Sequence, residues 1–373
     1  MFSRREPSAP QSAHERNNFD ALRLLGAFLV LVSHQFPLSA RPEPSIVGSI
    51  TVGRFGLMLF FCISGYLVAN SWIRDPSLQR FAARRFIRIW PALAAFVVAS
   101  SIVIGAASGD FATAARMLGN LLPYRILDSR SFPDNPLPFT NGSLWSIPLE
   151  IACYAGFAAV AIIAKGALRH ALLLLAALAA VYGLRFGIAV QTGRIPLGPA
   201  YLPLLACFFF VSALLAVQRP SRAATVLVFA ASLGALVLGN ATLAVILALP
   251  LATVAIGNRS WPVLRDAGRF GDLSYGLYLW AWPTQQIVIL WLGVETDWPT
   301  LLAISAGSVL GLAALSWHFV EAPALRLKPR RASEPQRAEA GQPASAPTQS
   351  PAPGSIAAGP QPAGQKADMP ATP

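Results

Sequence analysis

The sequence predicts an all-α integral membrane protein, a bundle of about ten transmembrane helices with both termini in the cytoplasm. Only 12% of its 373 residues are charged, about half the ~25% of soluble domains. Hydrophobic residues reach 54% and the mean hydropathy is +0.52. A soluble globule of this composition would lack the polar surface that water requires, so most of the chain is expected in lipid. Apolar stretches of membrane-spanning length are the third observation.

A transmembrane helix needs about 20 mostly apolar residues. Ten segments meet this criterion along the chain. The pair on either side of Gly239-Asn240 is separated by the shortest break, so one long segment with a re-entrant piece is the alternative there. The ten predicted spans are Phe19–Leu38, Thr51–Trp72, Ile89–Ala106, Ser146–Ala164, Ala171–Val190, Ala200–Val217, Ala223–Leu238, Ala241–Gly257, Leu273–Gly293 and Pro299–Val320.

The charges of the connecting segments set the predicted orientation, because Lys and Arg accumulate on the cytoplasmic side. With the N-terminus inside, 21 Lys and Arg residues fall in inside segments and six in outside segments, counting Arg54 at the outer end of its span. This asymmetry requires an even number of crossings. Localisation in the bacterial inner membrane, as a multi-pass protein in contact with the bilayer, is the corresponding expectation.

Three regions follow from this arrangement. Residues 1–18 form a cytoplasmic N-terminal segment and residues 19–327 the membrane domain. Residues 328–373 contain ten prolines and no Phe, Trp, Tyr, Leu or Val. Such a composition buries too little surface to fold, so a disordered Pro/Ala-rich cytoplasmic tail is predicted. The longest outside segment, 107–145, is expected to lie over the membrane domain as a lid.

Several function classes are excluded by composition. The formal net charge of +12 first suggests nucleic acid, but the charges are too few for a basic binding face, and no nucleic-acid partner is expected. Cys62, Cys153 and Cys207 lie in apolar runs without metal-ligand spacing, and the four histidines are scattered. Neither a disulfide framework nor a metal site is predicted.

Ionisable residues within predicted spans mark function by default, because they are costly in lipid. Arg23 and His34 lie eleven residues apart on the first span, about 16 Å along one helix face. The functional interpretation is a basic anchor near the cytoplasm and a proton-transferring imidazole near the outer surface. Alternatively, Arg23 pairs with Asp20 and His34 only ends the helix at the interface. Arg185 and Glu321 are further charges in or beside spans.

Glu150 favours the functional interpretation. Its span begins outside, so it is expected to enter the membrane from the same side as His34. A carboxylate at that depth needs a partner, and a carboxylate that orients an imidazole is a recurring catalytic arrangement. Pairing with Arg185 as a structural contact is the alternative.

Arg84, Arg85 and Arg88 precede the third span on the cytoplasmic side. Arg85 and Arg88 are i,i+3 neighbours that present two guanidinium groups to one ligand, a geometry that suits phosphate. On spacing alone, an ordinary positive-inside cluster is the favoured interpretation. Near the other end of the chain, Tyr275 and Tyr278 are either a ligand surface or part of an interfacial aromatic belt.

Six motifs together resemble the membrane-bound acyltransferase family 3, the O-acetylase-like proteins, over Asn17 to Leu327. They occur in the family's order along the chain. The motifs are NNFDALRLLGAFLVLVSH, FGLMLFFCISGYLV, RFAARRFIRIWPAL, NGSLWSIPLEIACY, DLSYGLYLWAWPTQQ and SWHFVEAPALRL.

The resemblance implies that acyl groups, usually acetyl, pass from cytoplasmic acyl-CoA to a hydroxyl of a saccharide, a lipid-linked acceptor or another small acceptor. Acyl-CoA is then a co-substrate, and no cofactor is bound permanently. The family's essential Arg and His correspond to Arg23 and His34, the latter as base or acyl carrier, and its Glu to Glu150. Its coenzyme A element corresponds to Arg85 and Arg88, with Arg84 beside them. The substrate-cavity candidates are Ser143, Trp145, Tyr275, Tyr278 and Gln285.

One motif departs from a common version of the family. Where many members have Trp-His-Trp-Pro, this chain has Trp280-Ala281-Trp282-Pro283, so any role of that histidine is absent. A transporter or flippase that uses the same intramembrane charges is the alternative from another functional class.

Overall fold

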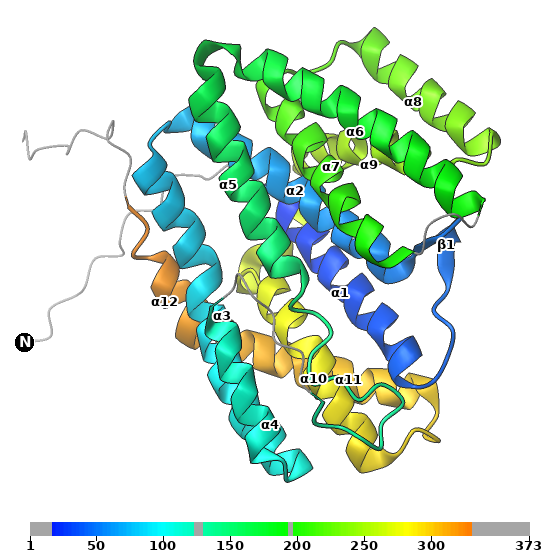
Figure 1. Ribbon diagram of the computed structural model, residues 1–373. Helices are drawn as coiled ribbons and strands as arrows, with labels where there is room; N and C mark the ends of the chain where they lie inside the picture. Colours follow the sequence, from blue (N-terminus) through cyan, green and yellow to red (C-terminus); the bar gives the residue numbers. More distant parts are fainter. Residues whose placement is uncertain (1–16, 123–129, 193–196, 330–373) are drawn as a thin grey trace, which may run out of the picture. The chain divides into compact units, whose positions relative to one another are not determined.

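A computed structural model describes residues 17–122, 130–192 and 197–329, all within one compact unit, Met1–Arg331. This part of the chain is almost wholly helical (Figure 1). Its one sheet is a short antiparallel pair, β1 (Ser45–Val47) with β2 (Ile50–Thr51). Residues 1–16 of the predicted N-terminal segment and residues 330–373 of the predicted tail lie outside the described residues.

A helix lies at each of the ten predicted spans. In chain order these helices are α1 (Phe19–Leu38), α2 (Val52–Arg74), α3 (Leu78–Ser108), α5 (Ser146–Ala164), α6 (Leu168–Gln191), α7 (Leu197–Val217), α8 (Arg222–Val237), α9 (Ala241–Gly257), α10 (Ser274–Leu292) and α11 (Trp298–Ser316). Shorter elements are α4 (Phe111–Arg116), α12 (Ala322–Leu325), the 3₁₀ turns η1 (Met117–Leu121), η2 (Lys165–Ala167) and η3 (Leu264–Phe270), and a π-helical turn, η4 (Trp317–Glu321).

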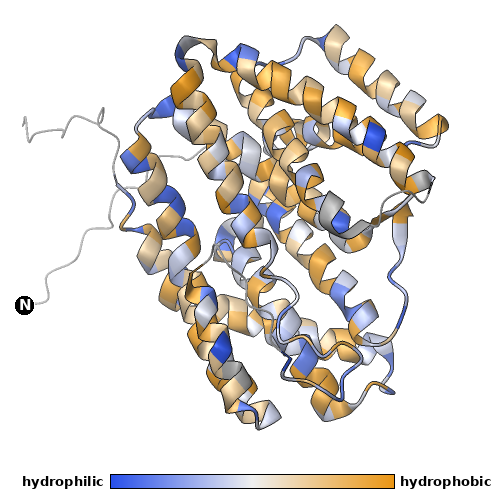
Figure 2. Ribbon diagram, in the orientation of Figure 1, coloured by the Kyte–Doolittle hydropathy of each residue, from blue (hydrophilic) through white to orange (hydrophobic). Residues whose placement is uncertain are grey.

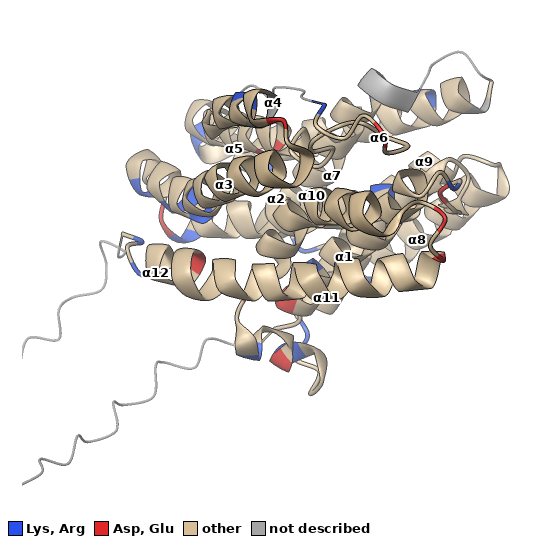
Figure 3. Ribbon diagram, turned by 90° about the horizontal axis from the view of Figure 1, so that it is seen from below, with Lys and Arg blue, Asp and Glu red and all other residues tan. Residues whose placement is uncertain are grey.

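Five helical segments of the described residues are long and apolar enough to cross a membrane. They are Phe19–Leu38, Val52–Arg74, Leu78–Ser108, Ser146–Val190 and Trp298–Leu325, and three shorter apolar helices accompany them. Hydrophobic residues cover most of each helix (Figure 2), while Lys, Arg, Asp and Glu are sparse along them (Figure 3). The fold is therefore that of a helical membrane protein. The number of ten crossings and the cytoplasmic termini stay predictions.

The break at Gly239-Asn240 separates two helices. Gly239 adopts a left-handed φ of 81°, which favours glycine. The Asn240 side chain accepts a hydrogen bond from the Leu243 amide at 3.0 Å and so caps α9, and it donates to the Leu184 carbonyl at 3.1 Å. These contacts end α8 and start α9, so the alternative of one long segment is wrong.

The third helix begins eleven residues before the predicted span, at Leu78 instead of Ile89. The apolar criterion excluded this part because it contains several arginines. Arginine is a good helix former, and the charges here have partners. Arg80 and Arg84 bind Asp75 at 2.6 and 2.8 Å, and Arg88 binds Asp272. The helix therefore continues through the basic residues and fixes the direction of each guanidinium group.

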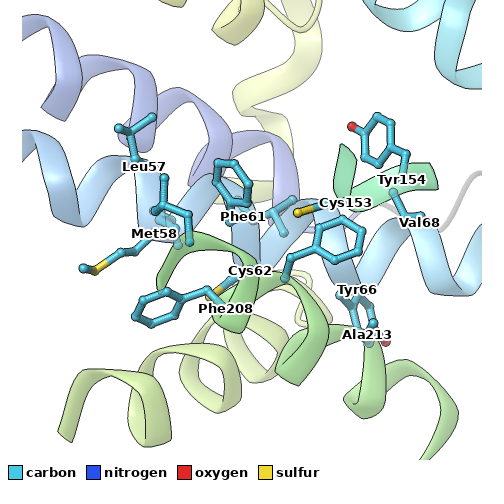
Figure 4. Packing of buried hydrophobic residues seen from close by; sticks show 14 of the residues in the cluster. Leu57, Met58, Phe61, Cys62, Tyr66, Val68, Cys153, Tyr154, Phe208 and Ala213 are labelled. Atoms are coloured by element: carbon cyan, nitrogen blue, oxygen red, sulfur yellow. The ribbon is translucent and has the colours of Figure 1, made fainter. Parts of the chain in front are cut away.

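Glycines let the central helices approach closely. Gly26 of α1 lies against Gly56 and Phe60 of α2, and a Cβ on Gly65 would lie 2.0 Å from the Phe209 carbonyl oxygen of α7. Such contacts of small residues are typical of membrane helix pairs. Beside them, α2 side chains pack against Phe208 of α7 in the main core cluster (Figure 4). Gly65 thereby fixes how α2 is turned, and with it the direction of its neighbour Ser64.

The chain reaches α5 by a segment that lies along α10 (Figure 1). The side chain of Asn135 bonds Gln286 at 2.7 Å, the carbonyl of Phe139 accepts from the Trp282 indole at 3.0 Å, and Ser146 contacts Tyr278 at 2.6 Å. From Gln286 to Tyr278 is eight residues, or about 12 Å of helix. This part of the predicted lid thus runs beside α10, from Gln286 toward Tyr278, instead of lying over the domain.

Candidate active site

A carboxylate just before α10 joins two arginines. Asp272 Oδ2 lies 2.6 Å from Arg88 Nη2 of α3 and 3.1 Å from Arg23 Nε of α1, and Arg23 also pairs with Asp20. Burial alone would raise the pKa of Asp272, but the charges of Arg23 and Arg88 and a hydrogen bond from Ser274 hold it well below its usual range. The carboxylate stays ionised and holds both guanidinium groups at one place.

We expect Asp272→Ala to destabilise the protein strongly. The substitution leaves Arg23 and Arg88 side by side and largely buried without their shared counter-charge, a loss of about 3–5 kcal/mol when one partner of a buried pair is removed. The measurement is thermal unfolding of purified protein in detergent. Asp297→Ala, which removes the exposed cap of α11, is the control and should lower the melting temperature much less. Equal shifts for the two variants would contradict the bridging role.

A cavity of ≈ 120 Å³ adjoins this ion-pair group, and Arg23 and Arg88 form part of its wall. It is lined by side chains of five helices, α1, α2, α3, α5 and α10. Its apolar wall includes Leu57, Phe60 and Ile147. The polar and charged residues that line it are Arg23, Ser64, Arg85, Arg88, Ser146, Glu150, Tyr154, Ser274, Tyr275 and Tyr278.

Arg85 and Arg88 line the cavity, and the guanidinium group of each lies near aromatic rings. The guanidinium of Arg85 lies over the rings of Phe81 and Tyr154 at 5.7 and 5.6 Å, and its buried Nε has no hydrogen-bond partner. Arg88 lies 6.0 Å from the ring of Tyr275. Rings hold the arginines in place, while the unpartnered Nε–H of Arg85 suits an anionic ligand.

Glu150 belongs to a hydrogen-bonded group of three side chains at the cavity wall. Ser64 Oγ donates to Glu150 Oε1 at 3.1 Å and lies 3.1 Å from the Tyr154 hydroxyl, which also donates to Glu150. Within the described residues no salt bridge reaches Glu150. Because both hydroxyls donate to Glu150, this group offers hydroxyl and carboxylate oxygens that accept hydrogen bonds from a polar ligand in the cavity.

His34 does not line this cavity. Its ring meets the edge of Trp282 with centroids 5.0 Å apart, and its Nδ1 is buried without a hydrogen-bond partner. The predicted contact with Glu150 is absent from the described structure. The reason is the path of the chain before α5. Because this segment first runs along α10 as far as Tyr278, Glu150 lies level with Arg23 and Ser64, which line the same cavity, and not with His34.

The other predicted residues divide into two sets. Tyr275 and Tyr278 line the cavity, and their hydroxyls bond the carbonyls of Ile89 and Ser143. Arg84 instead points to Asp75. Hydrogen bonds from Arg80 and Arg84 hold the pKa of Asp75 well below its usual range.

Three substrate-cavity candidates also lie elsewhere. Trp145 packs against Tyr201 with centroids 6.4 Å apart. Gln285 is fully buried and bonds the Leu31 carbonyl and Gln35, which ties α10 to α1. Ser143 is also buried and outside the cavity. These three residues, like Arg84, do not line the cavity.

Sequence reasoning missed three members of the site. Asp272 immediately precedes a span and falls on the same predicted side as Arg85 and Arg88, which would have suggested it as their counter-ion. Tyr154 follows Glu150 by four residues and so shares its helix face. Ser64 has no acid or base near it in the sequence, so no catalytic role was predicted for it. Glu321, named as a possible intramembrane charge, is buried in η4 and bonds Ser316 at 2.9 Å.

Comparisons with known proteins match nearly the whole membrane domain. A family model described as an acyltransferase domain matches residues 16–317. The chain is similar to an O-acetyl transferase of Shigella phage Sf6, with 33% identity over 331 residues, 83% of this chain and 96% of the relative. It is also similar to nodulation protein 10 of Rhizobium leguminosarum bv. viciae, with 27% identity over 365 residues, 86% of this chain and 96% of the relative. No solved structure matches. The family match includes every residue that lines the cavity.

Proposed function

The chain belongs to the acyltransferase domain family, and from this premise we propose that it moves an acetyl group from acyl-CoA to a hydroxyl of a saccharide or another envelope or exported acceptor. That it is a membrane-associated acyltransferase follows from the family and from its O-acetyl transferase relative. The name of that relative also supports acetyl as the transferred group. Because the family is enzymatic, it favours acyl transfer over the transporter alternative.

The convergence of Arg23, Arg85 and Arg88 on one cavity is the observation that carries the proposal. Coenzyme A brings several phosphate groups, and guanidinium groups bind phosphate through paired, charge-assisted hydrogen bonds. On the predicted topology these arginines lie toward the cytoplasm, where acyl-CoA is found. The arrangement therefore suits the phosphate end of the donor.

The cavity wall next to the arginines suits the pantetheine arm of the donor. Ser64, Glu150 and Tyr154 together present hydroxyl and carboxylate groups, which can bond the two amides of the pantetheine arm. This replaces the expected role of Glu150 as the partner of His34. The apolar residues Leu57 and Phe60 at the other end suit a small acyl group.

His34 is the proposed base for the acceptor. Its imidazole takes the proton of the acceptor hydroxyl while that oxygen forms a bond to the thioester carbonyl carbon. The carbon–sulfur bond then breaks, and coenzyme A leaves as the thiolate, which takes up the proton. The distance of about 16 Å between Arg23 and His34 along α1 is one that an extended pantetheine arm spans. The arm is thus long enough to bring the acyl group toward His34 while the phosphates stay at the arginines.

The test follows the acetyl group itself. Membranes from cells that express the chain, and from cells that lack it, are incubated with coenzyme A acetylated with carbon-14. We expect label in the envelope polysaccharide or lipid fraction only when the chain is present, and we expect mild base to release it as acetate. Label that stays in acetyl-CoA, or that crosses vesicles unchanged, would refute the proposal in favour of an inactive relative or a transporter.

A further inference from the structure

Between the cavity and His34 lies a barrier formed by Trp282 of α10. Tyr278 is the last α10 residue that lines the cavity, and it precedes Trp282 by four residues, about 6 Å of helix. The ring of Trp282 is 6% exposed and touches the His34 ring. Along α10, therefore, Trp282 follows the end of the cavity and separates it from the imidazole.

The segment before α5 holds Trp282 in this position. The Phe139 carbonyl accepts a hydrogen bond from the indole N–H at 3.0 Å. A Cβ on Gly142 would lie 2.6 Å from the Trp282 ring, so only glycine leaves room for the ring here. Ser143 and Ser146 bind Tyr278, one turn earlier on the same helix. The barrier is thus a tightly packed contact between one tryptophan and a chain segment.

Polar atoms around this contact have no hydrogen-bond partners. His34 Nδ1, Asn141 Nδ2 and Ser143 Oγ are all buried and unpaired. Buried groups of this kind cost free energy unless a partner satisfies them. Asn141 and Ser143 flank Gly142 in the chain, so two of these atoms belong to the segment that contacts Trp282. The hydroxyls of an acceptor that displaces the segment would supply the missing partners.

We propose that Trp282, seated on Gly142, is the residue that selects the acceptor over water, by keeping water from the acyl donor until an acceptor moves the segment. The inference rests on the proposed function, because it requires acyl-CoA in the cavity and His34 as the base. Hydrolysis is the competing reaction. Water oxygen bonds to the thioester carbonyl carbon, His34 takes a proton from the water, and the carbon–sulfur bond breaks to give acetate and coenzyme A.

The experiment measures release of labelled acetate from acetyl-CoA by purified protein without acceptor. Trp282→Ala should raise hydrolysis severalfold. Gly142→Ala should also raise it, since the added methyl pushes the ring away while Trp282 itself remains. The double variant Trp282→Ala, His34→Ala should return to the wild-type rate. Trp280→Ala is the matched control: Trp280 is on the same helix but packs on Phe96, and its loss should not raise hydrolysis.

The outcomes test the barrier inference and the proposed function separately. If wild-type protein transfers acetyl groups but neither barrier variant hydrolyses acetyl-CoA faster, the barrier inference is wrong and the proposed function stands. The barrier inference is equally wrong if Trp280→Ala raises hydrolysis to the same extent, or if the increase survives the loss of His34. If neither the wild type nor any variant consumes acetyl-CoA in hydrolysis or transfer, the proposed function falls and the inference with it.

Discussion

His34→Ala should lower the rate of acetyl transfer by roughly 10²- to 10⁴-fold, the usual contribution of general-base catalysis. Without the imidazole, the acceptor hydroxyl loses its proposed base as its oxygen attacks the thioester. Binding of acetyl-CoA should be unchanged, because His34 does not line the cavity. The measurement is the initial rate at which labelled acetyl enters the envelope fraction, with acetyl-CoA binding measured on the same preparation.

His318→Ala is the matched control. His318 lies in η4, is exposed, and its ring bonds the Ala314 carbonyl of the preceding helix α11 at 2.8 Å. Its removal should leave transfer near the wild-type rate. Near-normal turnover by correctly inserted His34→Ala protein would remove His34 from the mechanism. Loss of transfer together with loss of acetyl-CoA binding would instead give His34 a structural role.

Arg88→Ala should weaken binding of acetyl-CoA by about 10- to 150-fold, the equivalent of ~1.5–3 kcal/mol for a hydrogen bond to a charged group. Arg88 faces the cavity from α3 and donates to Asp272 at 2.6 Å, so its position is fixed before the ligand arrives. The loss should be larger at low than at high salt, because phosphate contacts are electrostatic. Equilibrium binding of acetyl-CoA to purified protein at two salt concentrations measures both effects.

Arg84→Ala provides the comparison. Arg84 and Arg88 are one turn apart on α3, yet Arg84 binds Asp75 at 2.8 Å and does not line the cavity. The net charge of the two variants is the same, so their difference reports position and not overall charge. Equal losses of affinity from the two substitutions would mean that the arginines attract the donor only through the general positive charge of this side.

Most helix bounds were predictable, because apolar length alone determines them. The predicted span Phe19–Leu38 coincides with α1, and Ser146–Ala164 with α5. The criterion failed at α3, where paired arginines extend the helix into a region that hydropathy excludes. The depth at which a residue lies in the helix bundle was less predictable than the length of its helix. A sequence does not reveal that the segment before α5 descends beside α10, since its hydrogen bonds join residues about 150 positions apart.

The error about Glu150 follows from this difference in depth. Of the predicted site residues, Arg23, Arg85, Arg88 and Glu150 meet at one cavity. The expected pairing of Glu150 with His34 assumed that both lie equally near the outer surface. Contacts of Glu150 with Ser64 and Tyr154 satisfy its carboxylate instead. Asp272 was missed because it lies just outside a span, where charged residues are common and carry little information.

Photoaffinity labelling tests most directly whether acyl-CoA occupies this cavity. Purified protein is irradiated with a coenzyme A thioester whose short acyl group carries a diazirine, and the labelled peptides are sequenced by mass spectrometry. We predict adducts on residues at the apolar end of the cavity, such as Leu57, Phe60 and Tyr278, that acetyl-CoA competes away and that Arg88→Ala diminishes. Adducts confined to the apolar groove between α3, α10 and α11, around Trp291 and Phe319, or labelling that acetyl-CoA does not reduce, would contradict the proposed donor site.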